Sequence, residues 1–141
     1  MIKFELLPAD VRSNIPKAKD VLEQDGNVVF AYIFGGLAGA QMRPMSDVDI
    51  AVYVKAADNV AQYKLGLFER LTDVLGTGEL DLIILNTAPV SLTGRILQNR
   101  LIISDKEPFL RHAYESATLR AFFDFRVKEE AFFRRRYGLG G

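Results

Sequence analysis

Residues 35–49 read Gly35-Gly36-Leu37-Ala38-Gly39-Ala40-Gln41-Met42-Arg43-Pro44-Met45-Ser46-Asp47-Val48-Asp49. The apolar run Val28–Phe34 precedes this stretch, and it has the composition of a strand buried on both faces. The stretch Asp47–Val54 starts polar and becomes apolar, which predicts a second strand. In a strand, residues two apart project from the same face, about 6.6 Å apart along the chain. Asp47 and Asp49 therefore point the same way and can share a metal ion.

The composition restricts the kind of metal that this pair could hold. Two carboxylates so close together repel each other unless a cation neutralises them. The chain has no cysteine and a single histidine, which excludes thiolate metal sites and multi-histidine zinc sites. A metal must then be held by carboxylates, and carboxylate oxygens favour a hard cation such as Mg²⁺ or Mn²⁺.

A third carboxylate repeats the pattern. Asp81 lies near the start of another apolar run, Glu79–Leu85, which predicts a third strand. If this strand lies beside Asp47–Val54, Asp81 completes a three-carboxylate site. Glu79 lies on the same face of the strand and is the competing carboxylate.

Gly35 and Gly36 directly follow the first predicted strand. Glycines at such a place let backbone N–H groups approach an anion closely, as in loops that cradle phosphates. The chain has neither Gly-x-x-x-x-Gly-Lys-Ser/Thr nor a Gly-x-Gly-x-x-Gly that opens a helix. The sequence therefore excludes a P-loop and a dinucleotide-binding site of the Rossmann type.

Helices and strands alternate along the rest of the chain. We expect helices over 8–24 with a break at Pro16, over 58–75 with Asp58 as its cap, over 89–99, and over 107–137. A fourth strand is expected over 101–104. This pattern predicts an α/β (α+β) fold, and 141 residues without a long linker predict one domain, residues 1–141.

Charge and hydropathy bear on partners and location. Lys plus Arg equals Asp plus Glu, at 18 each, whereas proteins that bind nucleic acid carry excess positive charge. We therefore expect no direct binding to nucleic acid. No apolar stretch is long enough for a signal peptide or a membrane span, so we expect no membrane association and a cytoplasmic location.

The last predicted helix carries more aromatic side chains than one helix buries against a small sheet. The residues Leu110, Tyr114, Ala117, Ala121 and Phe125 trace one helical stripe. Phe122 and Phe133 lie eleven residues apart on one face outside it. Two interpretations stay open: these aromatics belong to the core, or they form an interface with a partner protein or a second copy of the chain.

Together, the strand, the Gly-Gly pair, the Ser46-Asp47-Val48-Asp49 sequence and the later Asp81 resemble the DNA polymerase β-type nucleotidyltransferase superfamily. The short length and the stretch 85–89 (Leu-Asn-Thr-Ala-Pro) resemble its MNT proteins, minimal nucleotidyltransferases that are paired with HEPN-domain toxins. This resemblance covers nearly the whole chain. It implies a nucleotidyltransferase fold, with a mixed β-sheet flanked by helices and a long C-terminal helix.

The resemblance also implies residue roles. Two Mg²⁺ ions would be bound by Asp47, Asp49 and Asp81, and ATP would be the donor. Asp81 would also help to deprotonate the attacking hydroxyl. The nucleotide-binding residues would be Gly35, Gly36, Ser46 and Arg43.

The sequence departs from the family pattern in its loop. Gly36 stands where serine is common, and Gly39-Ala40 where Arg-Gly is common, so Arg43 would have to supply the missing phosphate-directed cation.

By this resemblance the leading hypothesis is a Mg²⁺-dependent antitoxin that transfers AMP from ATP to a hydroxyl, on a tyrosine, of a cognate HEPN toxin. One alternative is a nucleotidyltransferase that modifies a small molecule such as an aminoglycoside, although those enzymes usually add a helical domain for the acceptor. Another is a non-catalytic antitoxin that neutralises its partner by contact.

Overall fold

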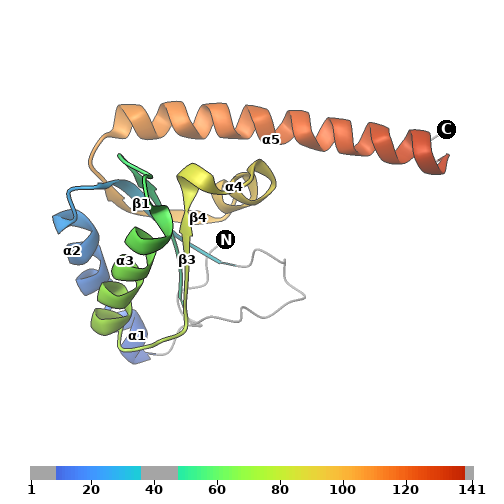
Figure 1. Ribbon diagram of the computed structural model, residues 1–141. Helices are drawn as coiled ribbons and strands as arrows, with labels where there is room; N and C mark the ends of the chain where they lie inside the picture. The colour runs from blue at the N-terminus through green and yellow to red at the C-terminus, as the bar shows by residue number, and fades with distance from the viewer. Residues whose placement is uncertain (1–8, 36–47, 139–141) are drawn as a thin grey trace.

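The computed structural model describes residues 9–35 and 48–138 (Figure 1). Its elements follow the order that the sequence predicts, and the expected mixed sheet, flanking helices and long last helix are all present. The helices are α1 (Ala9–Ser13), α2 (Ile15–Gln24), α3 (Val60–Leu75), α4 (Val90–Leu97) and α5 (Pro108–Tyr137), with the short 3-10 helix η2 (Leu85–Thr87). The strands are β1 (Val28–Phe34), β2 (Val48–Val54), β3 (Leu80–Ile84) and β4 (Arg100–Asp105).

The four strands form one sheet in the order β3-β2-β1-β4. β1 pairs with β2 and with β4 in antiparallel fashion, whereas β2 and β3 run parallel. The parallel pair requires a crossover, and α3 provides it between the two strands. The end of β1 and the beginnings of β2, β3 and β4 therefore lie together along one edge of the sheet. This edge is formed by the ends of strands and not by an outer strand.

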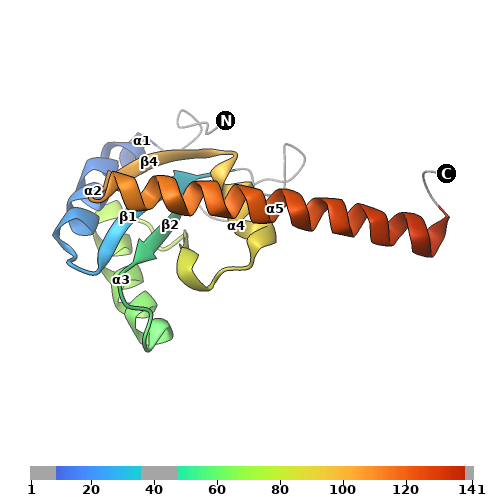
Figure 2. The same ribbon diagram turned by 90° about the horizontal axis from the view of Figure 1, so that it is seen from above.

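Helices cover both faces of the sheet, so its strands are nearly continuous in apolar residues. On one face, α2 and α3 bury Leu22, Leu67 and Leu71 against Ile50 and other residues that alternate along the strands. The opposite face packs under α4 and α5 around a second cluster that includes Phe30, Tyr32 and Ile96. Figure 2 shows α5 lying across this second face.

Local chemistry accounts for the breaks between elements. Pro16 occupies the first turn of α2, where its missing N–H costs nothing, and the chain breaks between α1 and α2 as expected. Gly76 ends α3 with φ of 75°, in the left-handed region that glycine adopts at low cost. The side chain of Asn14 donates a hydrogen bond of 3.1 Å to the carbonyl of Leu75, so the junction of α1 and α2 also caps the end of α3.

The predicted cap of α3 is wrong. The residue that precedes the first turn is Asn59, not Asp58, and it adopts φ of 52° without a side-chain cap to the helix backbone. Asparagine tolerates the left-handed region better than most residues because its short polar side chain can bond locally. Its amide donates to Gln62 at 2.6 Å instead.

The predicted inner stripe of α5 is also wrong. Leu110 and Phe125 are more than one third exposed, whereas Arg111, Thr118 and Phe122 are buried. The stripe is displaced because Arg111 is buried through ion pairs, which a search for apolar periodicity cannot detect. Phe122 is a core residue, only 2% exposed, so it cannot share an interface with the exposed Phe133.

The described helices carry no membrane-spanning signature. Within residues 9–35 and 48–138, no helix is both long enough and apolar enough to cross a bilayer.

Candidate functional site

The two candidate aspartates that the structure describes lie side by side in the sheet. Asp49 of β2 and Asp81 of β3 are partners in the parallel register. Residues opposite each other on neighbouring strands project from the same face, and such strands lie about 4.8 Å apart. Val48, Ile50, Leu80 and Leu82, the neighbours of the two aspartates, belong to the core under α2 and α3. The aspartates therefore face the other side, where α4 and α5 lie.

This pair belongs to a row that crosses the whole sheet. Asp49 is also the register partner of Phe34 on β1, and Phe34 is in turn the partner of Arg100 on β4. Both Asp49 and Asp81 stand at the beginning of their strands, and Phe34 ends β1 immediately before Gly35. The candidate site thus occupies one edge of the sheet, on the face that α4 and α5 share.

Gly35 is held in place by Asn99, the residue that precedes β4. The side-chain amide of Asn99 donates a hydrogen bond to the carbonyl oxygen of Gly35. The oxygen of the Asn99 side chain is buried, and it has no hydrogen-bond partner among residues 9–35 and 48–138. Among the described residues, no atom lies within 4 Å of the position that a Cβ would take at Gly35.

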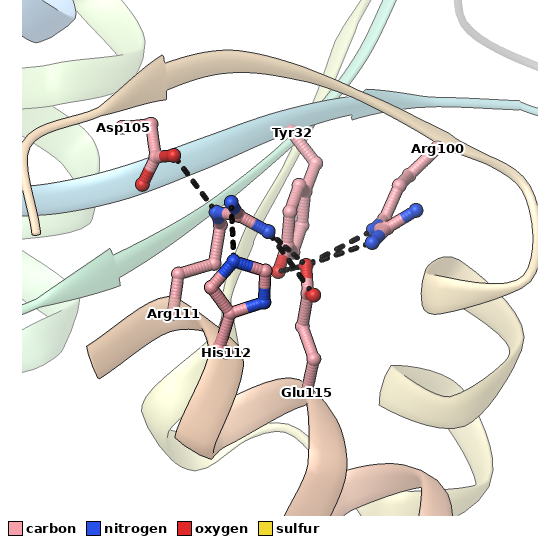
Figure 3. Close-up of polar contacts among 6 residues, drawn as sticks. All are labelled: Tyr32, Arg100, Asp105, Arg111, His112 and Glu115. Atoms are coloured by element: carbon pink, nitrogen blue, oxygen red, sulfur yellow. Dashed lines mark hydrogen bonds and ion pairs between the residues drawn. The ribbon is translucent and has the colours of Figure 1, made fainter. Parts of the chain in front are cut away.

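A network of polar and charged side chains binds α5 to β1 and β4 (Figure 3). Glu115 of α5 accepts hydrogen bonds from the Tyr32 hydroxyl at 2.7 Å and from Arg100 Nη2 at 2.8 Å. Arg111 forms ion pairs with Glu115 at 3.1 Å and with Asp105 at 3.0 Å. The Arg100 guanidinium also lies over the Tyr32 ring, 5.3 Å from its centroid.

These contacts shift the pKa values of both acidic partners. Burial alone would raise the pKa of Glu115, but hydrogen bonds from Tyr32, Arg100 and Arg111 outweigh burial and lower it. Burial, together with the neighbouring Glu115 carboxylate, raises the pKa of the Tyr32 hydroxyl far above its usual range. Glu115 is therefore ionised and Tyr32 is neutral at neutral pH.

The donor set at the site fits a hard divalent cation. Asp49 and Asp81 offer carboxylate oxygens from neighbouring strands, which is the ligand chemistry that Mg²⁺ prefers. Among residues 9–35 and 48–138, no group of three metal-ligating side chains is found. Asp47, the third candidate, lies outside the described residues, as do the candidate nucleotide-binding residues Gly36, Arg43 and Ser46.

The competing carboxylate, Glu79, lies one residue before β3. Its carbonyl accepts a hydrogen bond of 3.2 Å from the amide of Val48, and its side chain is exposed. The residue that is aligned with Asp49 is Asp81, so the register favours Asp81 as the partner of Asp49.

Two residues at this edge were not identified from the sequence. The sequence pattern places Asn99 at the end of a predicted helix and indicates no role for Arg100. Only the antiparallel pairing of β4 with β1, between segments more than sixty residues apart, brings them next to Gly35 and Phe34. No local pattern marks such a contact.

The part of the chain that contains this site also matches a known protein family. A family model described as "Polymerase beta, Nucleotidyltransferase" matches residues 16–108, more than half of the chain. The match extends from the start of α2 to the start of α5 and includes every candidate site residue. Among the curated proteins, none matches the sequence.

Solved structures share the fold over nearly their full length. A chain of the complex between tri-AMPylated HEPN toxin and MNT antitoxin from Shewanella oneidensis superposes with a TM-score of 0.68 at 18% identity, over 89% of this chain and 97% of that one. A chain of the toxin–antitoxin MntA–HepT gives 0.67 at 20% identity, over 88% and 97%. A toxin–antitoxin structure with AMP-PNP gives 0.63 at 19% identity, over 91% and 98%. At these identities the likeness establishes the fold.

Proposed function

Because this chain belongs to the polymerase beta nucleotidyltransferase family, we propose that it transfers AMP from ATP to a tyrosine hydroxyl of a cognate HEPN-domain toxin and so acts as an antitoxin. The observation that carries the proposal is the register pairing of Asp49 with Asp81, at the edge of the sheet where β1 ends at Gly35. Two adjacent carboxylates at the start of apolar strands are costly without a cation. A nucleotide with its metal ions supplies that cation.

Asp47, Asp49 and Asp81 would hold two Mg²⁺ ions, with Mn²⁺ as a substitute. When bound, the ions neutralise charge on the triphosphate and on the reacting oxygens. Gly35 and Gly36 would leave room for the phosphates, and Ser46 and Arg43 would contact them. The hydrogen bond from Asn99 holds the backbone of Gly35 at the end of β1, which fixes where this loop begins.

The reaction is a substitution at the α-phosphorus of ATP. The hydroxyl oxygen of the acceptor forms a bond to that phosphorus, the bond to the bridging oxygen breaks, and pyrophosphate leaves. The hydroxyl proton passes to the carboxylate of Asp81, whose exposed position at the edge of the sheet is accessible to an incoming acceptor. Positioning and charge stabilisation supply most of the catalysis in transfers of this kind.

The choice of acceptor is supported by the structural neighbours. One of them contains a HEPN toxin that carries AMP groups, in complex with its MNT antitoxin, and another contains the ATP analogue AMP-PNP. These descriptions apply to those proteins, and this chain shares their fold over nearly the whole of their length. The similarity supports a protein acceptor over a small molecule.

The test uses the purified chain, a HEPN-domain protein as the acceptor, and ATP labelled at the α-phosphate. We expect label on the toxin in the presence of Mg²⁺, none with EDTA, and a mass increase that matches AMP. Asp81→Asn should reduce transfer by at least a thousandfold. Asp73→Asn, on the exposed side of α3 over the opposite face of the sheet, is the matched control and should transfer normally.

Two outcomes would contradict the proposal in different ways. If the chain binds the toxin and suppresses it but transfers no label, it is a non-catalytic antitoxin. If ATP binds with equal affinity in Mg²⁺ and in EDTA by calorimetry, the aspartates do not share a metal with the nucleotide.

A further inference from the structure

The second half of α5 projects beyond the rest of the described structure (Figures 1 and 2). We call residues 123–136 the arm. Every residue of the arm is exposed, whereas Arg111, Thr118 and Phe122 in the first half of the same helix are buried. At 1.5 Å per residue the arm is about 20 Å long. A helix of this length gains little stability from its own hydrogen bonds, so an unpaired arm calls for a reason.

The arm carries apolar side chains that stay about half exposed or more in the described structure. Their exposed fractions are 57% for Phe123, 67% for Val127, 53% for Phe132 and 45% for Phe133. Single exposed apolar residues are common on protein surfaces, but a group of them on one short segment is typical of interaction surfaces.

The stripe that packs α5 on the body continues along the arm. The positions Arg111, Glu115, Thr118 and Phe122 face α4 and the sheet at intervals of four, three and four residues. The same spacing continues with Phe125, Glu129, Phe132 and Arg136. Residues at this spacing lie along one side of a helix. The arm therefore continues the packing face of α5 into a part of the helix where every residue is exposed.

The arm extends past the edge of the sheet that carries the candidate site. Along α5, Arg111 contacts Asp105 at the end of β4, and Glu115 contacts Arg100 at its beginning. The helix thus runs along β4 toward the row of Arg100, Phe34, Asp49 and Asp81, and the arm begins beyond it. The two aspartates face the same side of the sheet as α5. A protein bound to the arm would therefore lie beside the candidate site.

The charges on the arm indicate which side chains a protein bound to it would need. The arm has five basic and three acidic side chains, and its last turn holds Arg134, Arg135 and Arg136. Arg134 pairs with Glu130 at 2.6 Å, and the Arg136 guanidinium lies 5.8 Å from the centroid of the Phe132 ring. A complementary surface combines an apolar groove with acidic groups near the end of the arm.

A second copy of the same arm does not provide that surface. Two arms paired in parallel would bring Glu129 against Glu129 and Arg136 against Arg136 in the seam. Two arms paired antiparallel by the same stripe would set Phe132 against Glu129 and Phe125 against Arg136. Both arrangements desolvate charged side chains that have no opposite charge beside them. The free-energy cost of that desolvation exceeds the stabilisation from the apolar contacts.

We propose that the arm is the docking surface for the protein that accepts the nucleotide, and that this acceptor offers an apolar groove bordered by acidic side chains. The inference rests on the proposed function, since it names where the acceptor is held for the transfer. It also separates this chain from a transferase for small molecules, which has no use for an apolar arm beside its site.

The probe is the same HEPN-domain protein that serves as the acceptor in the transfer test. The double variant Phe132→Ser/Phe133→Ser removes two exposed aromatics from the arm. The matched control is Phe109→Ser on the same helix, which removes a Phe that is 92% exposed at the opposite end. Affinity for the probe is measured by calorimetry, transfer by α-labelled ATP, and Mg²⁺-ATP binding separately.

We expect the double variant to bind the probe at least tenfold more weakly and to transfer AMP with a correspondingly raised KM for the acceptor. Its melting temperature and its affinity for Mg²⁺-ATP should equal those of the parent chain, and Phe109→Ser should behave like the parent throughout. Asp81→Asn should show the reverse pattern, with normal binding of the probe and no transfer.

Three results would overturn the inference. The first is unchanged affinity of the folded double variant for the probe. The second is a parent chain that is dimeric by sedimentation and becomes monomeric in the double variant, which would make a second copy the occupant. The third is a parent chain that does not bind the probe. Arm-dependent binding without any transfer would instead sustain the docking surface and remove the proposed reaction.

Discussion

The carboxylate of Glu115 on α5 lies 2.8 Å from the guanidinium of Arg100 on β4. Arg100 stands in the same row of the sheet as Phe34, Asp49 and Asp81. The long helix is therefore held by a charge pair at the edge where the candidate site lies. Glu115 also accepts a hydrogen bond from the Tyr32 hydroxyl and forms an ion pair with Arg111. One carboxylate therefore binds three donor side chains, which are mostly buried.

We expect Glu115→Gln to destabilise the protein by about 2–4 kcal/mol at neutral pH, because it leaves two arginines without their shared counter-charge. The difference from the parent should depend on pH. The pKa of Glu115 is lower in the folded state than its ordinary value of 4.5, so its stabilising contribution is complete above that value. The contribution is lost as the pH falls through the lower, folded pKa.

Melting curves of both proteins between about pH 7 and pH 3 check this expectation. The two curves should converge at the acid end. Glu130→Gln is the control, because its pair with Arg134 is more than half exposed on both sides and such pairs contribute little. A constant difference between parent and Glu115→Gln across the range would show that the ionised carboxylate is not what stabilises the network.

Gly94 of α4 lies close against Phe122 of α5. A Cβ at this position would overlap the ring of Phe122. We expect Gly94→Ala to lower the stability by about 1–3 kcal/mol, because overpacking outweighs the roughly 1 kcal/mol that alanine gains over glycine in a helix. Urea unfolding followed by circular dichroism measures the change.

The control for this substitution is Gly66→Ala on α3. Gly66 is exposed, and no atom of the described residues is found within 4 Å of its would-be Cβ, so alanine should stabilise the protein there. Combining Gly94→Ala with Phe122→Leu should restore part of the loss, since the smaller side chain makes room. Equal effects at Gly94 and Gly66 would mean that α4 and α5 are not in close contact.

Asn86, in the stretch that follows β3, bonds to the last residue of β2, at the end of that strand opposite the candidate site. Its side chain accepts a hydrogen bond of 2.9 Å from the amide of Val54 and donates one of 2.9 Å to the carbonyl of the same residue. Val54 is buried, and β3 ends at Ile84. We expect Asn86→Ala to cost about 1–3 kcal/mol, because both backbone groups lose a partner. Asn86→Asp keeps only the acceptor, so in the same unfolding assay it should recover part of the loss at most.

Much of this fold follows from local sequence signals. Buried parallel and central strands have continuous apolar runs, and Pro16 and Gly76 mark boundaries through fixed or permissive backbone angles. The places of Asp49 and Asp81 near the starts of two apolar strands follow from the same reasoning, whereas only the structure shows that these strands are neighbours. The strands and the helix boundaries need no knowledge of distant contacts.

Other features depend on contacts that no local pattern encodes. Arg111 and Glu115 lie on the buried side of α5 only because Asp105, Arg100 and Tyr32 supply their partners. Apolar periodicity therefore selected the wrong stripe. Phe122 and Phe133 look equivalent in the sequence, but only Phe122 meets Gly94, so one is core and the other is exposed.

The pairing of Asp49 with Asp81 leads to a prediction about stability that is independent of turnover. Like charges directly opposite each other on neighbouring strands destabilise a sheet, and a bound cation reverses that effect. Metal-free Asp81→Asn should therefore melt at or slightly above the temperature of the metal-free parent. Addition of Mg²⁺ with a non-hydrolysable ATP analogue should raise the melting temperature of the parent and leave the variant unchanged, because a ligand stabilises the protein only through binding to the folded state.

Two further variants decide which carboxylates take part. Glu79→Gln should keep the full response to Mg²⁺ and nucleotide, because Glu79 precedes β3 and is not aligned with Asp49. Asp73→Asn should also keep it, because Asp73 belongs to α3, over the opposite face of the sheet. Glu79→Gln could instead abolish the response while Asp81→Asn keeps it. The cation would then be held by Glu79, two residues before Asp81. The site would then have to be rebuilt around Glu79.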